Sequence, residues 1–365
     1  MPFESPLVDI HRDYGADFTV FAGWNMPLKF TSALKETLAV RNAAGVFDVS
    51  HMGRLSITGK DATRFLNTVT TNQVDVEIGR SRYTLTLNYE GGIKDDDMAF
   101  RVGAEEYMVV VNAASREKIL AWFEEMAARR QMDVEIKDET FSTAMLAVQG
   151  PQARQVVHEI LGREIKIKKF RNTLVDVEGS QALVSRTGYT GEDGYEIIFW
   201  DVGVAERFLR SLVDKGVAPC GLGARDILRL EAGLPLYGQD MDEETTPVEA
   251  DLMFAVDLSK DFIGKDAVAS RVEEGPREVR VGLKSSSRRA PRHGDLLLAE
   301  GETVGRVTSG TFSPTVGVGV AMGYLKSDLA SPGTKLTAKG LGEIPVEVVK
   351  MPFYDTTKYG WRRKR

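Results

Sequence analysis

Cysteine is almost absent from this chain, which has only Cys220 among its 365 residues. A single cysteine cannot form an internal disulfide or a cysteine-cluster metal site, and it is typical of a protein in a reducing compartment. Histidine is also scarce, with His11, His51, His158 and His293 only. We therefore expect no metal centre, and we expect Cys220 and His51 to have structural roles.

Long hydrophobic runs and a strong excess of one charge are missing as well. No stretch reaches the roughly 18 apolar residues of a membrane span. The N-terminal segment MPFESPLVDIHRDYG has acidic residues where a secretory signal would have an apolar core. The net charge of −6, from 47 basic and 53 acidic residues, argues against nucleic acid as the main partner. We expect a cytoplasmic protein that binds neither membrane nor nucleic acid.

Familiar nucleotide and metal motifs are absent too. The sequence contains no Walker A loop and no HExxH. Gly221 and Gly223 begin like a dinucleotide fingerprint, but Asp226 stands at the third glycine position. This departure argues against a dinucleotide site.

The hydrophobic patterns that are present predict an α+β protein. Alternation over 81–89, a Gly91-Gly92 turn and a return strand over 93–102 predict a hairpin, and 114–130 predicts an amphipathic helix. Strands and helices start again from 142. Beyond 275 only short strands separated by Gly, Pro and Ser turns follow, which is typical of an all-β sandwich or barrel.

The acidic triplet Asp95-Asp96-Asp97 is the first candidate for chemistry. It lies on the return strand of the predicted hairpin, where alternation places Asp96 on the opposite face from its two neighbours. One carboxylate is therefore expected to face a cavity. A solvated turn and a magnesium site are the alternatives.

Two further segments carry candidate binding residues. In SRTGYTGEDGYE (185–196), Tyr189 offers an aromatic face, and Glu196 begins an apolar strand where an unpaired carboxylate would be costly. Either the N–H groups of a ligand or a structural arginine would satisfy Glu196. In GLGARDILRLE (221–231), Arg225 and Arg229 lie one helical turn apart, suited either to an ion-pair network or to a ligand carbonyl.

These segments resemble the family of folate-binding aminomethyltransferases that includes the glycine cleavage T proteins. The resemblance runs nearly end to end and rests on ten motifs in order. They are FAGWNMP (21–27), RNAAGVFDVSHMG (41–53), NYEGGIKDDD (88–97), VVNAA (110–114), QGP (149–151), SRTGYTGEDGYE (185–196), GLGARDILRLEAGLPLYGQDM (221–241), FIGK (262–265), TSGTFSP (308–314) and KMPFY (350–354).

The resemblance implies an α+β fold with three domains around a central cavity. Residues 1–50 and 140–260 would form a discontinuous folate-binding domain of antiparallel sheet and helices. Residues 51–139 would form an inserted α+β domain that carries Asp96. Residues 261–365 would form a C-terminal all-β barrel or jelly roll.

The resemblance also implies the reaction. The lipoylated H protein of the glycine cleavage system would present an aminomethyl group, and its methylene would pass to tetrahydrofolate as co-substrate, without a metal. The products would be 5,10-methylenetetrahydrofolate, ammonia and the dihydrolipoyl carrier. Arg288, Arg289, Arg292 and His293, together with the terminal 362–365, are basic clusters that could dock an acidic carrier.

The family's functional residues can be matched to single positions of this chain. The match implies that Asp96 is the catalytic carboxylate and that it also contacts the folate. Two departures stand beside these positions: Lys94 and Asp97 flank the aspartates where the family has apolar residues, and Phe254 replaces a larger aromatic. The implied folate-binding residues are Tyr83, Asp96, Tyr189, Glu196, Arg225 and, with a one-residue offset, Tyr359.

One relative in the same fold family is a non-enzymatic folate-binding protein of iron–sulfur assembly. That group has a cysteine in a Lys-Gly-Cys-aromatic-x-Gly-Gln motif. The corresponding stretch here, GLPLYGQ (233–239), has none, which favours the enzyme.

Overall fold

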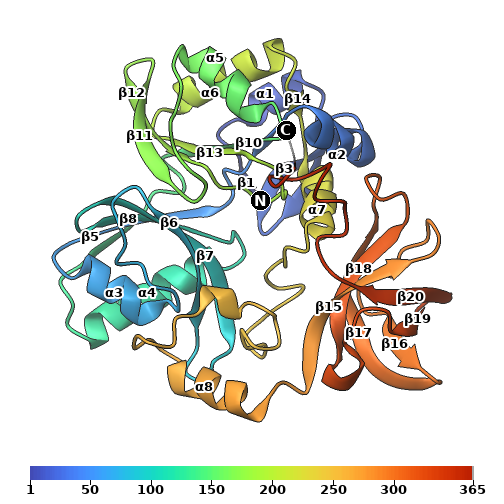
Figure 1. The fold of residues 1–365 in the computed structure, drawn as a ribbon. Coiled ribbons are helices and arrows are strands. Elements are labelled where there is room, and N and C mark those ends of the chain that lie inside the picture. The colour runs from blue at the N-terminus through green and yellow to red at the C-terminus, as the bar shows by residue number, and fades with distance from the viewer. Residues whose placement is uncertain (364–365) are drawn as a thin grey trace.

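The structure is a computed structural model that describes residues 1–363. Three lobes surround a common centre (Figure 1). Helices and strands are mixed in the two lobes built from the first two-thirds of the chain, while the last lobe is all β. The predicted α+β class is confirmed.

The upper lobe is built on a six-stranded sheet with the order β11-β12-β13-β10-β4-β14. Its central strands come from distant parts of the chain, since β4 (Gly45–Asp48) pairs antiparallel with β10 (Ala144–Gln149). The chain between them forms the second lobe. The remaining strands are β11 (Asn172–Val177), β12 (Ser180–Ser185), β13 (Gly194–Phe199) and β14 (Ala218–Pro219).

Both faces of this sheet are buried, as the uninterrupted apolar character of β10 indicates. Leu146 and Val148 face a core shared with α5 (Ala153–Leu161) and α6 (Val202–Asp214). Met145 and Ala147 face the opposite core, formed with α2 (Ala33–Asn42), α7 (Leu222–Glu231) and side chains of the second lobe. Alternate side chains of β10 therefore pack into two different cores, and the sheet connects the upper lobe to the second lobe.

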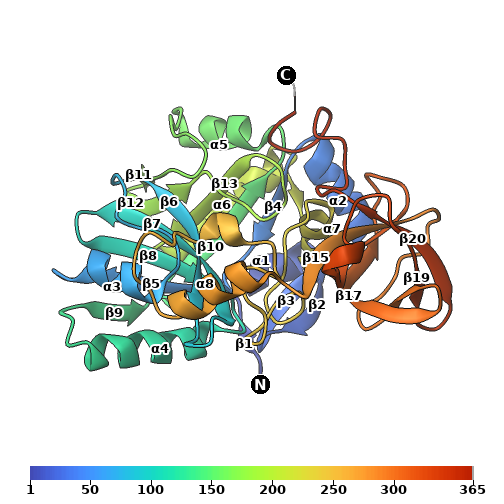
Figure 2. The same cartoon turned by 60° about the horizontal axis from the view of Figure 1, so that its bottom comes forward.

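The N-terminal elements add a small sheet that the hydrophobic pattern did not predict. Strand β3 (Trp24–Lys29) pairs with β1 (Phe3–Glu4) and with β2 (Asp17–Phe21), and α1 (Val8–Asp13) lies between the first two strands in sequence. The β2–β3 hairpin reaches the centre of the molecule beside α7 (Figure 2).

The second lobe is a five-stranded antiparallel sheet with the order β6-β7-β8-β5-β9, covered on one face by two helices. Its hairpin β6–β7 is the one predicted from 81–102. The other face of the sheet points toward the upper lobe. The elements are β5 (Gly53–Thr58), α3 (Ala62–Val69), β6 (Ser81–Leu87), β7 (Ile93–Gly103), β8 (Glu106–Val111), α4 (Arg116–Arg129) and β9 (Glu135–Asp138).

The segment 241–274 packs on this second lobe rather than on the upper lobe or the β lobe. Leu252 and Val268 share a core with Leu85 and Ile93, and the segment contains η1 (Met253–Ala255) and α8 (Lys265–Glu274). The boundary expected at 261 therefore falls inside one packed segment. Local patterns could not reveal this, because the apolar partners of this segment lie about 170 residues earlier in the chain.

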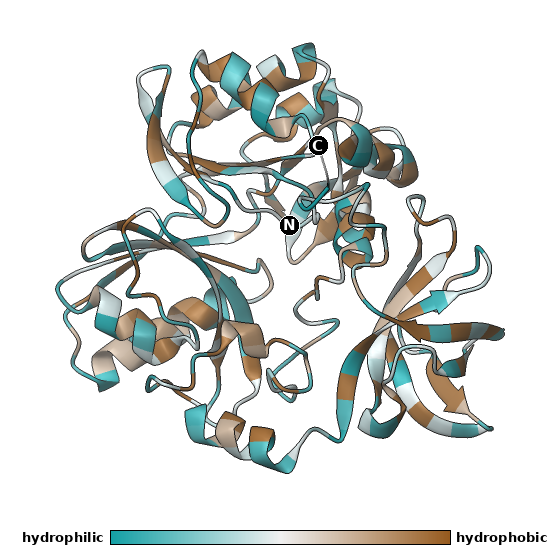
Figure 3. Ribbon diagram, viewed as in Figure 1, coloured by the Kyte–Doolittle hydropathy of each residue, from teal (hydrophilic) through white to brown (hydrophobic). Residues whose placement is uncertain are grey.

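The last lobe is a closed six-stranded barrel with the order β15-β18-β17-β16-β19-β20. Of the predicted sandwich or barrel, the barrel is confirmed. Brown and teal segments alternate along its strands (Figure 3), as expected when one face of each strand fills the interior. The elements are β15 (Glu278–Ser285), β16 (Leu296–Ala299), β17 (Glu302–Phe312), β18 (Gly319–Lys326), η2 (Ser327–Leu329), β19 (Lys335–Lys339) and β20 (Glu343–Val349).

The helices of residues 1–363 are short. The longest, α4, has 14 residues. None of the described helices combines the length and the apolar character needed to cross a bilayer.

Candidate functional site

A cavity of about 250 Å³ lies between the upper lobe, the second lobe and the segment 233–254. Five of the six predicted site residues line it. They come from three strands, one helix and one loop: Tyr83 on β6, Asp96 on β7, Glu196 on β13, Arg225 on α7 and Tyr189 in the loop after β12. Apolar side chains, among them Met52 and Leu252, form much of the remaining wall.

Asp96 faces this cavity and is held by two hydrogen bonds. The Tyr83 hydroxyl donates to Oδ2 at 3.0 Å, and Nδ2 of Asn112 donates to Oδ1 at 2.8 Å. Burial raises the pKa of Asp96 to about 8, with a further contribution from the charge of Asp95. A fixed carboxyl group with such a pKa exchanges protons near neutral pH.

The carboxyl groups of the two flanking aspartates bond within the second lobe, although Asp97 also contributes to the cavity wall. Asp95 and Asp97 are 0% and 1% exposed, so the solvated-turn alternative is wrong. The Asn112 backbone N–H donates to Asp95 at 2.9 Å, and the Thr86 hydroxyl donates to Asp97 at 2.5 Å. Burial raises the pKa of both carboxyl groups, that of Asp97 to about 7.

The magnesium alternative also finds no support. Residues 1–363 contain no group of three His, Cys, Asp or Glu side chains arranged to hold a metal ion. Nζ of Lys94 lies 3.3 Å from Glu243 and 4.6 Å above the Trp122 ring, so Lys94 pairs with Glu243 rather than with Asp97.

Glu196, on β13, also lines the cavity. Oε2 accepts a hydrogen bond of 2.5 Å from the Thr187 hydroxyl. Within the described residues no arginine forms an ion pair with Glu196, so the structural-partner alternative is not realised. Its carboxylate keeps acceptor capacity for a ligand.

Arg225 and Arg229 have separate roles although they lie on one side of α7. Arg229 forms the ion-pair network, 2.8 Å from Asp226 and 2.5 Å from Asp240. The Arg225 guanidinium lies 4.9 Å from the centre of the Tyr189 ring, and its buried Nη1 has no hydrogen-bond partner in the described chain. A buried, unpaired guanidinium is costly, so an acceptor on a ligand is the natural partner.

Phe254 and Asn112 belong to the site but were not predicted as ligand-contacting residues. The Phe254 ring stacks on Tyr83 with centroids 5.8 Å apart and planes at 17°, and it is 75% exposed at the cavity edge. An exposed aromatic next to a cavity can stack on a flat ligand. Asn112 lies in the motif VVNAA, but its bonds to two aspartates depend on pairing that sequence does not display.

A second cavity of about 380 Å³ adjoins the first, and the two share Met52, Asn112, Tyr189 and Arg225 as walls. Val20 and Phe21 of the β2–β3 hairpin line its far side. His51 lines it as well, and burial together with the charge of Arg225 lowers the pKa of His51 to about 3. His51 is therefore neutral, and its Nδ1 has no partner within residues 1–363.

The structure does not bring Tyr359 to either cavity. Its ring is 6.5 Å from the Tyr354 ring, and its N–H donates to the Asp355 carbonyl. The one-residue offset of this position from the family motif is consistent with that difference.

In the terminal basic cluster, Arg363 pairs with the buried Glu192, while residues 364–365 lie outside the described chain.

Comparison with known proteins relates the whole chain to one family. Residues 7–260 match the GCVT N-terminal domain, and residues 279–355 match the glycine cleavage T-protein C-terminal barrel domain. A probable aminomethyltransferase of Pyrococcus horikoshii is 40% identical, with 98% of each chain covered. The aminomethyltransferase of Bacillus subtilis is 41% identical over 96% of this chain and 98% of its own length. The crystal structure of glycine cleavage system aminomethyltransferase T from Bartonella henselae superimposes with a TM-score of 0.92 at 35% identity, covering 99% and 100% of the two chains.

Proposed function

The chain belongs to the glycine cleavage T-protein family of aminomethyltransferases, and on this premise we propose that it transfers a methylene group to tetrahydrofolate. The donor is the aminomethyl group carried on lipoylated H protein. The products are 5,10-methylenetetrahydrofolate, ammonia and the dihydrolipoyl carrier. Tetrahydrofolate is a co-substrate, and the proposed reaction needs no metal.

The observation that carries this proposal is the arrangement of acceptor and donor groups along one cavity. A pterin ring has an amino group and a ring N–H side by side, which a carboxylate such as Glu196 can accept together. Its carbonyl oxygen is an acceptor suited to the unpaired Nη1 of Arg225. The rings of Tyr83, Phe254 and Tyr189 supply faces for stacking. With Glu196 and Arg225 on the pterin edge, the reactive nitrogens of the folate would lie toward Asp96.

The chemistry required of Asp96 follows from the charges that form during transfer. N5 of the folate attacks the methylene carbon and the carbon–sulfur bond breaks, with net movement of the N5 proton to the departing sulfur of the dihydrolipoyl arm. N10 then attacks the same carbon to close the five-membered ring, and the amino group takes up a proton and leaves as ammonia. Closure at N10 forms a cationic nitrogen that must lose a proton. An ionised Asp96 stabilises the cation and accepts that proton, and its bonds from Tyr83 and Asn112 fix its direction.

The direct test is an assay with aminomethylated H protein and tetrahydrofolate. We expect ammonia and methylenetetrahydrofolate to appear in equal amounts, and neither to form when the carrier or the folate is omitted. Tight folate binding without either product would favour the non-enzymatic alternative instead. A Glu196→Ala variant should lose folate affinity, because it removes both acceptor oxygens.

A further inference from the structure

The last residues of the described chain return from the barrel to the loop that carries Tyr189. We call residues 350–363 the C-terminal strap, and residues 188–194 the tyrosine loop. The N–H of Phe353 donates to the Glu231 carbonyl at 2.9 Å, and the N–H of Trp361 donates to the Gly191 carbonyl at 3.0 Å. The strap thus crosses from one lobe to another and ends against the tyrosine loop (Figure 1).

Glu192 is the residue of the tyrosine loop to which the side chain of Arg363 and the backbone of Gly360 in the strap bind. Its side chain is 1% exposed, and it accepts hydrogen bonds from Nη1 of Arg41 at 3.1 Å and from the Gly360 N–H at 2.9 Å. The guanidinium of Arg363 forms a short ion pair with the other carboxylate oxygen. Three groups from two distant segments therefore fix one buried carboxylate.

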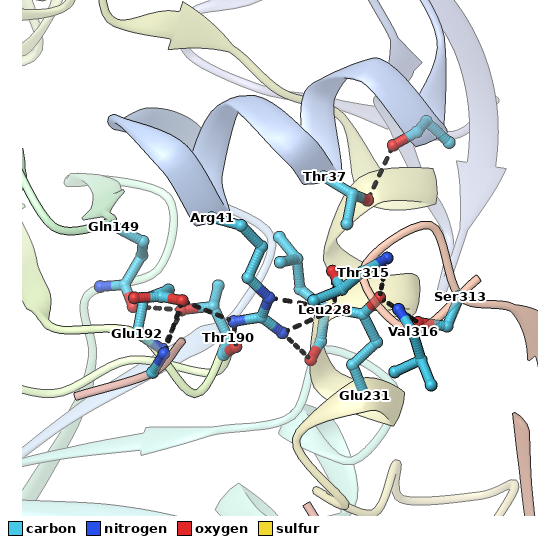
Figure 4. Close-up of polar contacts among 12 residues, drawn as sticks. Thr37, Arg41, Gln149, Thr190, Glu192, Leu228, Glu231, Ser313, Thr315 and Val316 are labelled. Atoms are coloured by element: carbon cyan, nitrogen blue, oxygen red, sulfur yellow. Dashed lines mark hydrogen bonds and ion pairs between the residues drawn. The ribbon is translucent and has the colours of Figure 1, made fainter. Parts of the chain in front are cut away.

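The charge balance around Glu192 requires Arg363. Figure 4 shows Arg41 between Glu192 and Glu231, and its Nε and Nη2 atoms lie 3.0 and 2.9 Å from Glu231. One fully buried guanidinium thus serves two buried carboxylates. Arg363, whose side chain is 22% exposed, supplies the second positive charge. Without it Glu192 would remain buried with only a shared cation, which is unfavourable.

The tyrosine loop passes this constraint on to the cavity. The Thr190 carbonyl oxygen accepts a hydrogen bond of 2.8 Å from Nη1 of Arg41, and the Tyr189 hydroxyl donates to the Pro235 carbonyl. Between these anchors the Tyr189 ring lies against the Arg225 guanidinium. A shift of Glu192 would therefore move the ring that forms one wall of the folate cavity.

We propose that Arg363 is a positioning residue for folate binding, acting through Glu192 to hold the tyrosine loop in its binding conformation. This inference rests on the proposed function, since it names the residue that prepares the same cavity for its ligand. Arg363 does not itself touch the cavity. Arg363 instead keeps the tyrosine loop ordered before the ligand binds, which lowers the entropy cost of binding.

The test compares three single variants of the full chain by calorimetric titration with tetrahydrofolate. Arg363→Gln removes the cation, and we expect its Kd for folate to rise about tenfold, as for loss of one charge-assisted contact. Arg363→Lys keeps the positive charge and should restore the affinity to within about threefold of wild type. Arg362→Gln is the matched control, because Arg362 is exposed and lies over the Trp361 ring rather than at Glu192.

Steady-state kinetics then separate positioning from general stability. In Arg363→Gln the KM for folate should rise while kcat at saturating folate stays near the wild-type value. An unchanged folate Kd in Arg363→Gln would overturn the inference, as would an equal loss in Arg362→Gln or a loss that Arg363→Lys does not rescue. If the wild-type protein binds no tetrahydrofolate, the proposed function itself fails and this inference fails with it.

Discussion

Asp96 gives the sharpest prediction, because its position in the cavity fixes the pH at which it can act. Burial raises its pKa to about 8, so the carboxyl group is mostly protonated in the free enzyme at neutral pH. With that value, about one molecule in ten carries the ionised form at pH 7 and about one in a hundred at pH 6. If the carboxylate is the active form, kcat/KM rises with pH up to about 8 and then levels.

The matching substitution is Asp96→Asn, which preserves the shape and the acceptor oxygen but cannot take a proton. We expect the variant to fold and to bind folate with a modest loss of affinity. Its transfer rate should fall by about 100-fold or more, the contribution typical of a positioned general base. The rise of kcat/KM between pH 6 and 8 should disappear, because the carboxyl group of Asp97, whose pKa is also raised, bonds to Thr86 rather than facing the ligand.

The assay is formation of methylenetetrahydrofolate at limiting folate, measured from pH 6 to 9 in wild type and Asp96→Asn. Folate affinity is measured in parallel by calorimetry to show that the cavity is intact. A wild-type profile that is flat over this range, or an Asp96→Asn variant with near-normal turnover, would refute the role given to this carboxylate.

Three further outcomes follow from the same site. Tyr83→Phe removes a hydrogen bond that favours the anion of Asp96, so the pKa of Asp96 should rise. The acid limb of the pH profile should then move to higher pH by less than about one unit. A shift to lower pH would contradict this. Arg225→Ala should weaken folate binding by about tenfold or more with a smaller effect on kcat at saturation, and unchanged affinity in a titration would remove Arg225 from the site. If Arg288 and Arg289 help dock an acidic carrier, the apparent KM for H protein should rise with salt. A variant with both arginines changed to glutamine should lose that salt dependence. An apparent KM of the wild-type enzyme that is flat from low to high salt would exclude the role.

Periodicity was enough to find the elements that carry the site. The alternation of 81–89 and the turn at Gly91-Gly92 predicted β6 and β7, and strand alternation placed Asp96 on a different face from Asp95 and Asp97. Such local rules work because one buried face sets the direction of every second side chain. The same reasoning could not choose which face meets a cavity.

Contacts between distant segments lay beyond these rules. The pairing of β4 with β10 closes one sheet across about 100 residues, and the packing of 241–274 on β6 and β7 spans a still longer separation. Neither leaves a signal in the local sequence. The sequence also could not show that Arg229 forms an ion pair while Arg225 stays free for a ligand, because the partner of Arg229, Asp240, comes from a loop beyond the helix.

The resemblance to a family supplied what local physics could not, and it did so unevenly. It singled out Glu196 and Arg225 among many charged residues, and the structure brings both to one cavity. It also suggested Tyr359, which the structure places beside Tyr354 instead. The structure brings five of the implied residues to one cavity, but not the residue from the terminal segment with an altered spacing.

The central claim is that one folate ring spans the cavity between two acids, and a crystal structure of the protein with bound tetrahydrofolate tests it most directly. We predict density for the pterin with its amino edge on Glu196, its carbonyl oxygen at Arg225 and its N5 and N10 atoms facing Asp96. A folate bound elsewhere, or one turned so that Asp96 meets only its glutamate tail, would contradict the account.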